Sequence, residues 1–127
     1  MDMSEELIRA AKSVSKRSYS PYSHFAVGAA VLTESDGMYT GTNIENASYG
    51  ATICAERVAV FNAITAGAKR IAAIAVYSET ALPYPCGMCL QVLSEFAGGD
   101  APVYLVSETE RVDLTLKDLL PHPFNKQ

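Results

Sequence analysis

Apolar positions in the first part of the chain recur at the spacing of an α-helix, with charged residues between them. They predict an amphipathic helix over residues 3–18, because residues three and four apart share one helix face. The positions on this face are Met3, Leu7, Ala10, Ala11 and Val14. Pro21 ends the helical segment, since a proline disfavours the helical conformation in the residue before it.

The rest of the chain alternates between short apolar runs and helical segments. Runs 24–33 and 38–44 are separated by a short polar turn, which predicts a β-hairpin. Run 70–79 is apolar at nearly every position, as expected of a strand covered on both faces. Runs 101–108 and 111–116 are too close in sequence for a crossover connection, so we expect them to pair antiparallel.

Two helices are expected between these strands, at 53–66 and 86–97, with a final short helical turn at 117–121. The order helix, strand, strand, helix, strand, helix, strand, strand predicts a three-layer α/β/α sandwich with a mixed five-stranded sheet. A length of 127 residues suits one domain, residues 1–127, that can bury enough surface to fold without disulfides.

Charge and composition exclude several classes of protein. The net charge is −4 and the basic residues are scattered, which argues against a nucleic-acid polymer as the partner. The N-terminus is acidic, so no signal peptide is expected, and no apolar run approaches the ~20 residues that span a membrane. We therefore expect a cytoplasmic protein, whose thiols stay reduced and free to bind metal.

The three cysteines of the chain all stand at the start of a predicted helix. Cys54 opens the helix at 53–66, while Cys86 and Cys89 open the helix at 86–97 and share one face of it. Both helices flank the central strand 70–79, so their first turns can meet at one edge of the sheet. Thiolates are favoured at helix N-termini, and three that converge form a zinc site by their chemistry.

The number of ligands predicts the kind of zinc site. The chain has three cysteines and two histidines, and neither histidine stands at ligand spacing to a cysteine. We therefore expect one Zn²⁺ per chain with water or hydroxide as its fourth ligand, which is the arrangement of a catalytic site. Glu56 is then placed to act as general base and later as general acid. Arg57 is expected to offset the net negative charge of three thiolates on one zinc ion.

Packing offers a simpler interpretation of each residue alone. Free cysteines are common as small buried hydrophobes, and glutamate is common in a first helical turn. A lone Cys-x-x-Cys is also often redox-active. The combination of Cys54 and Glu56 with Pro85-Cys86-x-x-Cys89, each at a helix start, is harder to explain by packing. By contrast, Val58, Phe61 and Ile64 are expected in the core.

The two motifs match the zinc-deaminase signature of His or Cys, one residue and Glu, followed by Pro-Cys-x-x-Cys. More narrowly, the chain resembles the cytidine deaminase family, in its small, three-cysteine, homotetrameric branch. The segments that carry the resemblance occur in family order and cover nearly the whole chain: YSPYSHFAVGAAV, GTNIENASYG, CAER, PCGMCLQV and LLPHPF.

The resemblance implies a role for each matching residue. Cys54, Cys86 and Cys89 match the zinc ligands, and Glu56 matches the proton shuttle. The residues that match nucleoside contacts are Asn43 and Glu45 for the ribose hydroxyls, Phe25 for an aromatic wall and the Ala55 backbone for the pyrimidine ring. Phe124 matches an aromatic that reaches into a neighbouring subunit's site, and Tyr49 matches a residue of the same shared region.

The implied activity is hydrolytic deamination of cytidine and deoxycytidine to uridine and deoxyuridine, with release of ammonia, in pyrimidine salvage. Two residues depart from the family pattern: Leu90 stands where an arginine is common, and Tyr84 stands before Pro85. Alternatives remain open at this point. One is a related small deaminase of another cytosine nucleoside, such as blasticidin S. Another is a non-catalytic zinc or redox-thiol module, which gives Glu56 no task.

Overall fold

The computed structural model describes residues 2–125, so residues 1, 126 and 127 of the predicted domain lie outside it. The strands are β1 (Val27–Thr33), β2 (Met38–Thr42), β3 (Ile71–Ser78), β4 (Pro102–Val106) and β5 (Arg111–Thr115). The helices are α1 (Ser4–Ser15), α2 (Ala55–Thr65), α3 (Gly87–Phe96) and α4 (Leu116–Leu119), with a 3₁₀ turn η1 (Tyr49–Ala51). No helix in the described range is long and apolar enough to cross a membrane.

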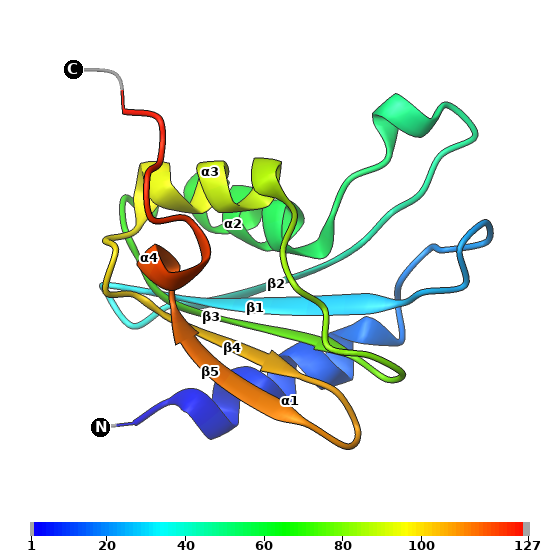
Figure 1. The fold of residues 1–127 in the computed structure, drawn as a ribbon, viewed down its shortest axis with the longest axis horizontal. Coiled ribbons are helices and arrows are strands. Elements are labelled where there is room, and N and C mark those ends of the chain that lie inside the picture. The colour runs from blue at the N-terminus through cyan, green and yellow to red at the C-terminus, as the bar shows by residue number, and fades with distance from the viewer. Residues whose placement is uncertain (1, 126–127) are drawn as a thin grey trace.

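The five strands form one sheet in the order β2-β1-β3-β4-β5. Strands β3 and β4 are parallel, and the other neighbours, including β4 and β5, are antiparallel. Helix α1 covers one face of the sheet, and α2 and α3 lie side by side on the other (Figure 1). The predicted three-layer α/β/α sandwich with a mixed five-stranded sheet is therefore confirmed.

The elements are shorter at their ends than the patterns predict. Helix α1 ends at Ser15 instead of residue 18. The backbone N–H groups of Arg17 and Ser18 donate to the carbonyl oxygens three residues earlier, which is the bonding of a turn and not of an α-helix. Strand β1 starts at Val27 because His24 has a φ of 58°, which an extended strand cannot contain. Helix α2 starts at Ala55, since the backbone of Ile53 still pairs with that of Ile44.

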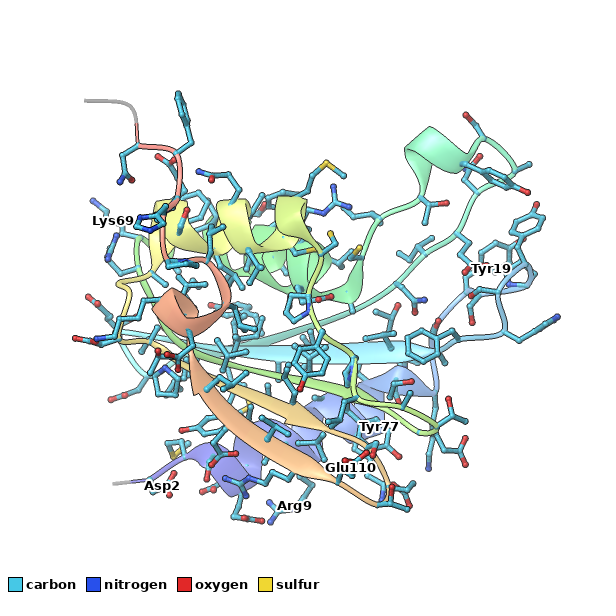
Figure 2. All side chains as sticks on the ribbon, in the orientation of Figure 1. Asp2, Arg9, Tyr19, Lys69, Tyr77 and Glu110 are labelled. Atoms are coloured by element: carbon cyan, nitrogen blue, oxygen red, sulfur yellow. The ribbon has the colours of Figure 1, made fainter. Side chains whose placement is uncertain are left out.

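Hydrophobic side chains fill both faces of the sheet, which confirms the double burial expected of β3 (Figure 2). On the α1 side, Leu7 and Ala11 pack against small residues of β1 and β3 and against Tyr77. On the other side, Ile74 and Val76 pack with residues of α2 and α3. The sheet is thus a rigid base for both helices that carry cysteines.

Helix α2 lies unusually close to the sheet, and this contradicts one prediction. Its buried residues are mostly small: Ala55, Ala59 and Ala63 are fully buried, together with Val60, and Glu56 is nearly so. Gly41 of β2 makes the close approach possible, since a Cβ there would lie 2.5 Å from the backbone nitrogen of Ala59. Phe61 is therefore not in the core: it lies on the outer side of α2 and is 42% exposed. Val58 and Ile64 are partly buried.

Candidate active site

Two loops extend together beyond one end of the sheet and lead into the site (Figure 1). The first follows α1 and contains Tyr19, which Figure 2 labels at this end of the molecule. The second connects β2 to α2. A backbone bridge between Tyr19 and Ile44 joins the loops, and a second bridge between Ile44 and Ile53 closes the β2–α2 connection on itself. The chain consequently enters α2 with Cys54 fixed just before the first turn.

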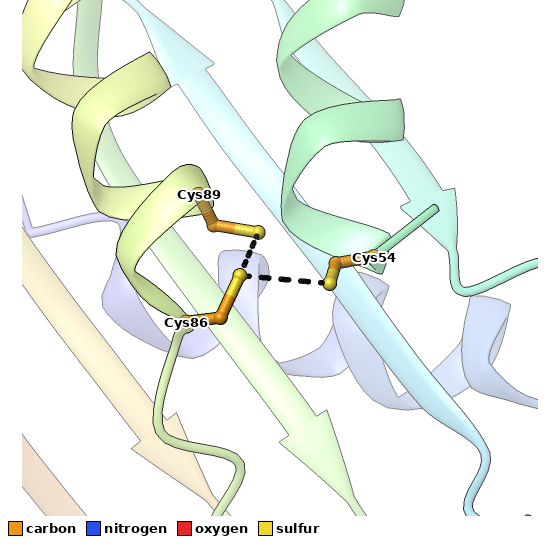
Figure 3. Close-up of side chains that lie close together, drawn as sticks. All are labelled: Cys54, Cys86 and Cys89. Atoms are coloured by element: carbon orange, nitrogen blue, oxygen red, sulfur yellow. Dashed lines mark hydrogen bonds between the residues drawn. The ribbon is translucent and has the colours of Figure 1, made fainter. Parts of the chain in front are cut away.

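The three cysteines converge between the first turns of α2 and α3, as the helix positions predict (Figure 3). Their sulfur atoms all lie within 4.8 Å of one another. The Sγ of Cys86 lies 3.9 Å from that of Cys54 and 3.4 Å from that of Cys89. A tetrahedral zinc with Zn–S bonds of about 2.3 Å holds its sulfur ligands about 3.8 Å apart. The thiols therefore fit a zinc ion by both chemistry and spacing.

Electrostatics at the thiols favour one thiolate even without a metal. The pKa of Cys54 is lowered to about 5, mainly because the Cys89 thiol donates a hydrogen bond to it and because Arg57 stabilises its negative charge. The pKa of Cys89 is raised, since its thiol is the donor in that bond and lies in a buried position. The Nη2 of Arg57 donates to the Sγ of Cys54 across 3.6 Å.

Glu56 is the buried carboxylate of the site. Its side chain points from the first turn of α2 and only 5% of the residue is exposed. Burial raises the pKa of Glu56 to about 7, its own backbone N–H partly offsets this, and the nearby Cys54 thiolate raises the pKa further. Among the described residues, the potential metal-ligand group contains the three cysteines and not this carboxylate. Glu56 is thus poised to exchange a proton near neutral pH without being a ligand.

A cavity of about 250 Å³ opens directly onto these groups. The predicted site residues that line it are Phe25, Asn43, Glu45, Cys54, Ala55, Glu56 and Cys86. Its walls come from both loops, from the first turn of α2 and from the segment before α3. Residues far apart in the sequence therefore form one pocket with an apolar wall at Phe25, a carboxylate at Glu45 and the thiols at one end.

The two polar residues from the β2–α2 loop are held in different ways. The carboxylate of Glu45 accepts hydrogen bonds from the backbone N–H groups of Tyr22 and Ser23, at 2.9 and 3.2 Å, and from the hydroxyl of Ser23. The Ser23 hydroxyl is the main reason that the pKa of Glu45 is lowered. Glu45 is thus kept ionised at the edge of the cavity. Its hydrogen bonds also hold the loop that follows α1, which contains Tyr22 and Ser23.

The Asn43 amide holds the start of β1. Its Oδ1 accepts from the N–H of Val27 at 3.0 Å, and its Nδ2 donates to the carbonyl of Phe25 at 2.7 Å. The second N–H of this amide has no hydrogen-bond partner among residues 2–125, and Asn43 lines the cavity. Asn43 therefore orients the aromatic wall and still offers a donor.

Two predicted residues lie outside the cavity of their own chain. Phe124 is 75% exposed on the C-terminal tail, and Tyr49 is 80% exposed in η1. The Tyr49 ring packs in a T-shaped arrangement with the ring of Tyr22, with ring centres 6.5 Å apart. Neither side chain completes the site within one chain.

Several lining residues carried no role in the sequence analysis. Ser23, Thr52 and Pro83 line the cavity, and so does Tyr84, the residue that departs from the family pattern before Pro85. Ser23 stands inside the YSPYSHF segment, but its partner Glu45 is 22 positions away in the sequence. Only the packing of the two loops reveals this contact.

Comparisons with known proteins agree with the site. A family described as the cytidine and deoxycytidylate deaminase zinc-binding region matches residues 1–105. A cytidine deaminase of Sporosarcina psychrophila is 44% identical over 97% of this chain and 92% of its own length. A probable cytidine deaminase of Dictyostelium discoideum is 40% identical over 97% of this chain and 84% of its own.

Solved structures give the same answer. The crystal structure of cytidine deaminase from Burkholderia pseudomallei matches with a TM-score of 0.89 and 43% identity, covering 94% of this chain and 98% of that one. That of Mycobacterium tuberculosis matches with a TM-score of 0.86 and 35% identity, covering 99% of this chain and all of that one. With a family match over most of its length and relatives that share its full fold, this chain belongs to the cytidine deaminase family, whose site binds zinc.

Proposed function

We propose that the protein catalyses the hydrolytic deamination of cytidine and deoxycytidine to uridine and deoxyuridine, with release of ammonia. The observation that supports this most strongly is the buried carboxylate of Glu56 beside three convergent thiols, at the floor of a cavity whose mouth carries Glu45. A cavity of about 250 Å³ suits a nucleoside.

Cys54, Cys86 and Cys89 hold the zinc ion in this proposal, and their thiolate charge is offset by Arg57. When bound by three protein ligands, zinc lowers the pKa of a water molecule toward ~7 and so supplies a nucleophile near neutral pH. No further carboxylate, histidine or cysteine of the described residues joins the three thiols, so a zinc ion held by them would remain accessible to a water molecule.

Glu56 moves the protons. It accepts one from the attacking water and delivers it to ring nitrogen N3 as the C4–O bond forms. It then takes the remaining proton from the new C4 hydroxyl and transfers it to the amino group, so the C4–N bond breaks, the C4 carbonyl forms and ammonia leaves. The two products contain all the atoms of the nucleoside and one water. A pKa of about 7 suits this exchange, since the carboxyl group must gain and lose a proton in each turnover.

The loops recognise the nucleoside. The ionised carboxylate of Glu45 accepts hydrogen bonds from the ribose hydroxyls, and the free N–H of the Asn43 amide donates to them. Phe25 provides the apolar wall for the base, and the Ala55 backbone contacts the pyrimidine ring. The intact pair of Asn43 and Glu45 favours a sugar-bearing substrate over free cytosine.

The assembly in this proposal is a homotetramer with shared sites, working in the cytoplasm in pyrimidine salvage. Phe124 of one chain completes the site of a neighbour, and Tyr49 belongs to the same contact region. Both side chains are exposed and lie away from their own cavity, which supports a partner. An isolated monomer is then expected to be inactive.

The test is ammonia release from the purified protein with cytidine, deoxycytidine, cytosine and blasticidin S in parallel, with Glu56→Ala as the blank. Release from the two nucleosides alone, lost in the blank, is the expected result. Release from blasticidin S in preference to them would assign a different substrate. Zinc-loaded protein that releases no ammonia from any of the four would exclude the proposed activity.

A further inference from the structure

The side chain of Gln91 grips the backbone of one residue of the C-terminal tail. Its Nε2 donates to the carbonyl oxygen of Phe124 at 2.8 Å, and its Oε1 accepts from the N–H of Phe124 at 3.1 Å. A primary amide is suited to this, since it offers a donor and an acceptor side by side. Gln91 lies in the second turn of α3, two positions after Cys89.

The tail has little else to fix it. Helix α4 ends at Leu119, and between there and Asn125 the tail contains Pro121 and Pro123, which have no N–H to donate. In the described part of the tail, residues 121–125, the two bonds to Gln91 are the only hydrogen bonds to the body of the protein. A cavity of about 280 Å³ lies beneath this segment, between α3 and the tail. The position of Phe124 therefore depends on Gln91.

The two hydrogen bonds from Gln91 fix the backbone of Phe124 and do not involve its ring. The ring does not line its own chain's cavity, and the residue is 75% exposed although it is strongly apolar. Two further exposed apolar residues lie on the same layer of the molecule: Met88 of α3, which is 64% exposed, and Phe61 of α2. A second copy of this chain is the partner that would cover these exposed apolar side chains, because the proposed shared sites already require a second copy beside Phe124.

We propose that Gln91 is a positioning residue for the neighbouring active site: its amide clamps the Phe124 backbone and so presents the Phe124 ring to the cavity of a second copy. The inference rests on the proposed function, in which Phe124 completes a neighbour's site. It adds that one side chain on the zinc-binding helix of a chain sets the geometry of another chain's pocket.

Two substitutions of Gln91 distinguish its hydrogen bonds to Phe124 from its contribution to the packing of α3. Gln91→Glu keeps the size of the side chain but replaces the donor with an acceptor, which faces the Phe124 carbonyl. Gln91→Ala removes both bonds. Gln91→Ala is expected to raise the KM for cytidine about tenfold, the size expected from losing two net hydrogen bonds, with a smaller change in kcat. Gln91→Glu loses one of these bonds and adds a repulsion between two oxygen atoms, so it should raise KM by a similar factor. Glu95→Ala, an exposed position on the same helix, is the matched control and should leave KM unchanged.

A mixing experiment tests whether Gln91 acts on another chain. Glu56→Ala chains, which keep Phe124, are co-assembled with Phe124→Ala chains, which keep Glu56, and mixed assemblies are isolated through two different affinity tags. The Glu56→Ala chain is the donor of a Phe124 ring, and the Phe124→Ala chain is the recipient, whose site is still catalytically competent. The Phe124 ring of the donor should restore a low KM to the site of the recipient. Gln91→Ala placed in the donor chain should abolish this rescue. The same substitution in the recipient chain, whose tail has no ring to present, should preserve it.

The outcomes separate the inference from the proposed function. The clamp would be wrong if rescue survives Gln91→Ala in the donor chain. It would also be wrong if Gln91→Ala abolishes rescue equally whether the donor or the recipient chain carries it. Neither result would contradict the deaminase activity. No rescue with an active wild type would overturn the sharing of Phe124 and the clamp with it. If the wild type is inactive on all nucleosides, hydrogen exchange still tests the clamp. The Phe124 amide should be protected from exchange in the wild type and lose this protection in Gln91→Ala. An unprotected amide in the wild type would refute the clamp.

Discussion

The guanidinium of Arg57 donates a hydrogen bond from Nη2 to the Sγ of Cys54, one of the three convergent thiols. Position 90, directly after Cys89, holds a leucine that packs into the core on the α2 and α3 side of the sheet. Among the described hydrogen bonds and ion pairs, Arg57 supplies the only cation that contacts a thiol. The negative charge of three thiolates on one zinc ion is therefore offset from one side only.

Replacing Arg57 by alanine should weaken zinc binding. The loss of the bond to Cys54 raises the cost of holding that sulfur as a thiolate, and removal of an outer partner of a metal ligand typically costs 10–100-fold in affinity. We expect a decrease of about tenfold, measured by competition with a chromogenic chelator. Arg70→Ala, which removes an exposed cation paired with Glu34, is the matched control. Equal zinc affinity in the two variants would contradict the role of Arg57.

Glu56→Gln should keep the metal and lose turnover. The amide preserves the size of a side chain that is almost fully buried, so the fold and the thiol cluster should persist. It cannot transfer protons, and general acid–base catalysis contributes about 10²–10⁴-fold. We expect kcat to fall at least 100-fold, on that scale, while zinc content measured by mass spectrometry stays at wild-type level. A variant with near-normal kcat would remove Glu56 from the mechanism.

The metal site was accessible to sequence reasoning because its geometry is local. Helical periodicity puts Cys86 and Cys89 on one face, and the order of elements brings Cys54 to the same edge of the sheet. The cavity depends on longer-range packing. The bond from Ser23 to Glu45 and the grip of Gln91 on Phe124 join residues 22 and 33 positions apart, and no periodic pattern encodes such pairs.

The misplacement of Phe61 has a related cause. Helix α2 has apolar residues all around its axis, so the pattern does not identify which face meets the sheet. The face that packs on the sheet is determined by Gly41 of β2, which allows close contact only with small side chains. The alanine-rich face of α2 therefore meets the sheet, and the Phe61 side chain lies on the outer side. Sequence reasoning favoured the bulky residue for the core, whereas close packing favoured the small ones.

Gly41→Ala should destabilise the protein. An added Cβ would lie 2.5 Å from the backbone nitrogen of Ala59 and 2.8 Å from the Cβ of Val58, and backbone atoms of a packed helix have no flexible end that can move aside. Overpacking of this kind costs about 1–3 kcal/mol in the free energy of unfolding. Chemical denaturation measures the loss. Gly98→Ala is the matched control, because a Cβ there meets nothing within 4 Å. Equal losses at both glycines would show that the close approach of α2 is not required.

Ser23→Ala should shift the pH dependence of nucleoside binding. The Ser23 hydroxyl is the main cause of the lowered pKa of Glu45, so its loss raises that pKa toward the usual value of a glutamate. A lowered pKa keeps the carboxylate ionised into acidic solution, and a protonated Glu45 offers a weaker acceptor to the ribose hydroxyls. As the pH falls, KM for cytidine should therefore begin to rise at a higher pH in the variant than in the wild type, with little difference between them near neutral pH.

Steady-state kinetics between about pH 4 and 8, a range that begins just below the usual pKa of a glutamate, measure this shift. Ser13→Ala, on the exposed side of α1, is the control for loss of a hydroxyl alone. The profile of kcat should keep its shape in all three proteins, because in the proposed function Glu45 contacts the sugar and not the reacting ring. A displaced kcat profile with an unchanged KM profile would mean that Ser23 acts on the proton transfers at Glu56, and that Glu45 is not the group that recognises the ribose.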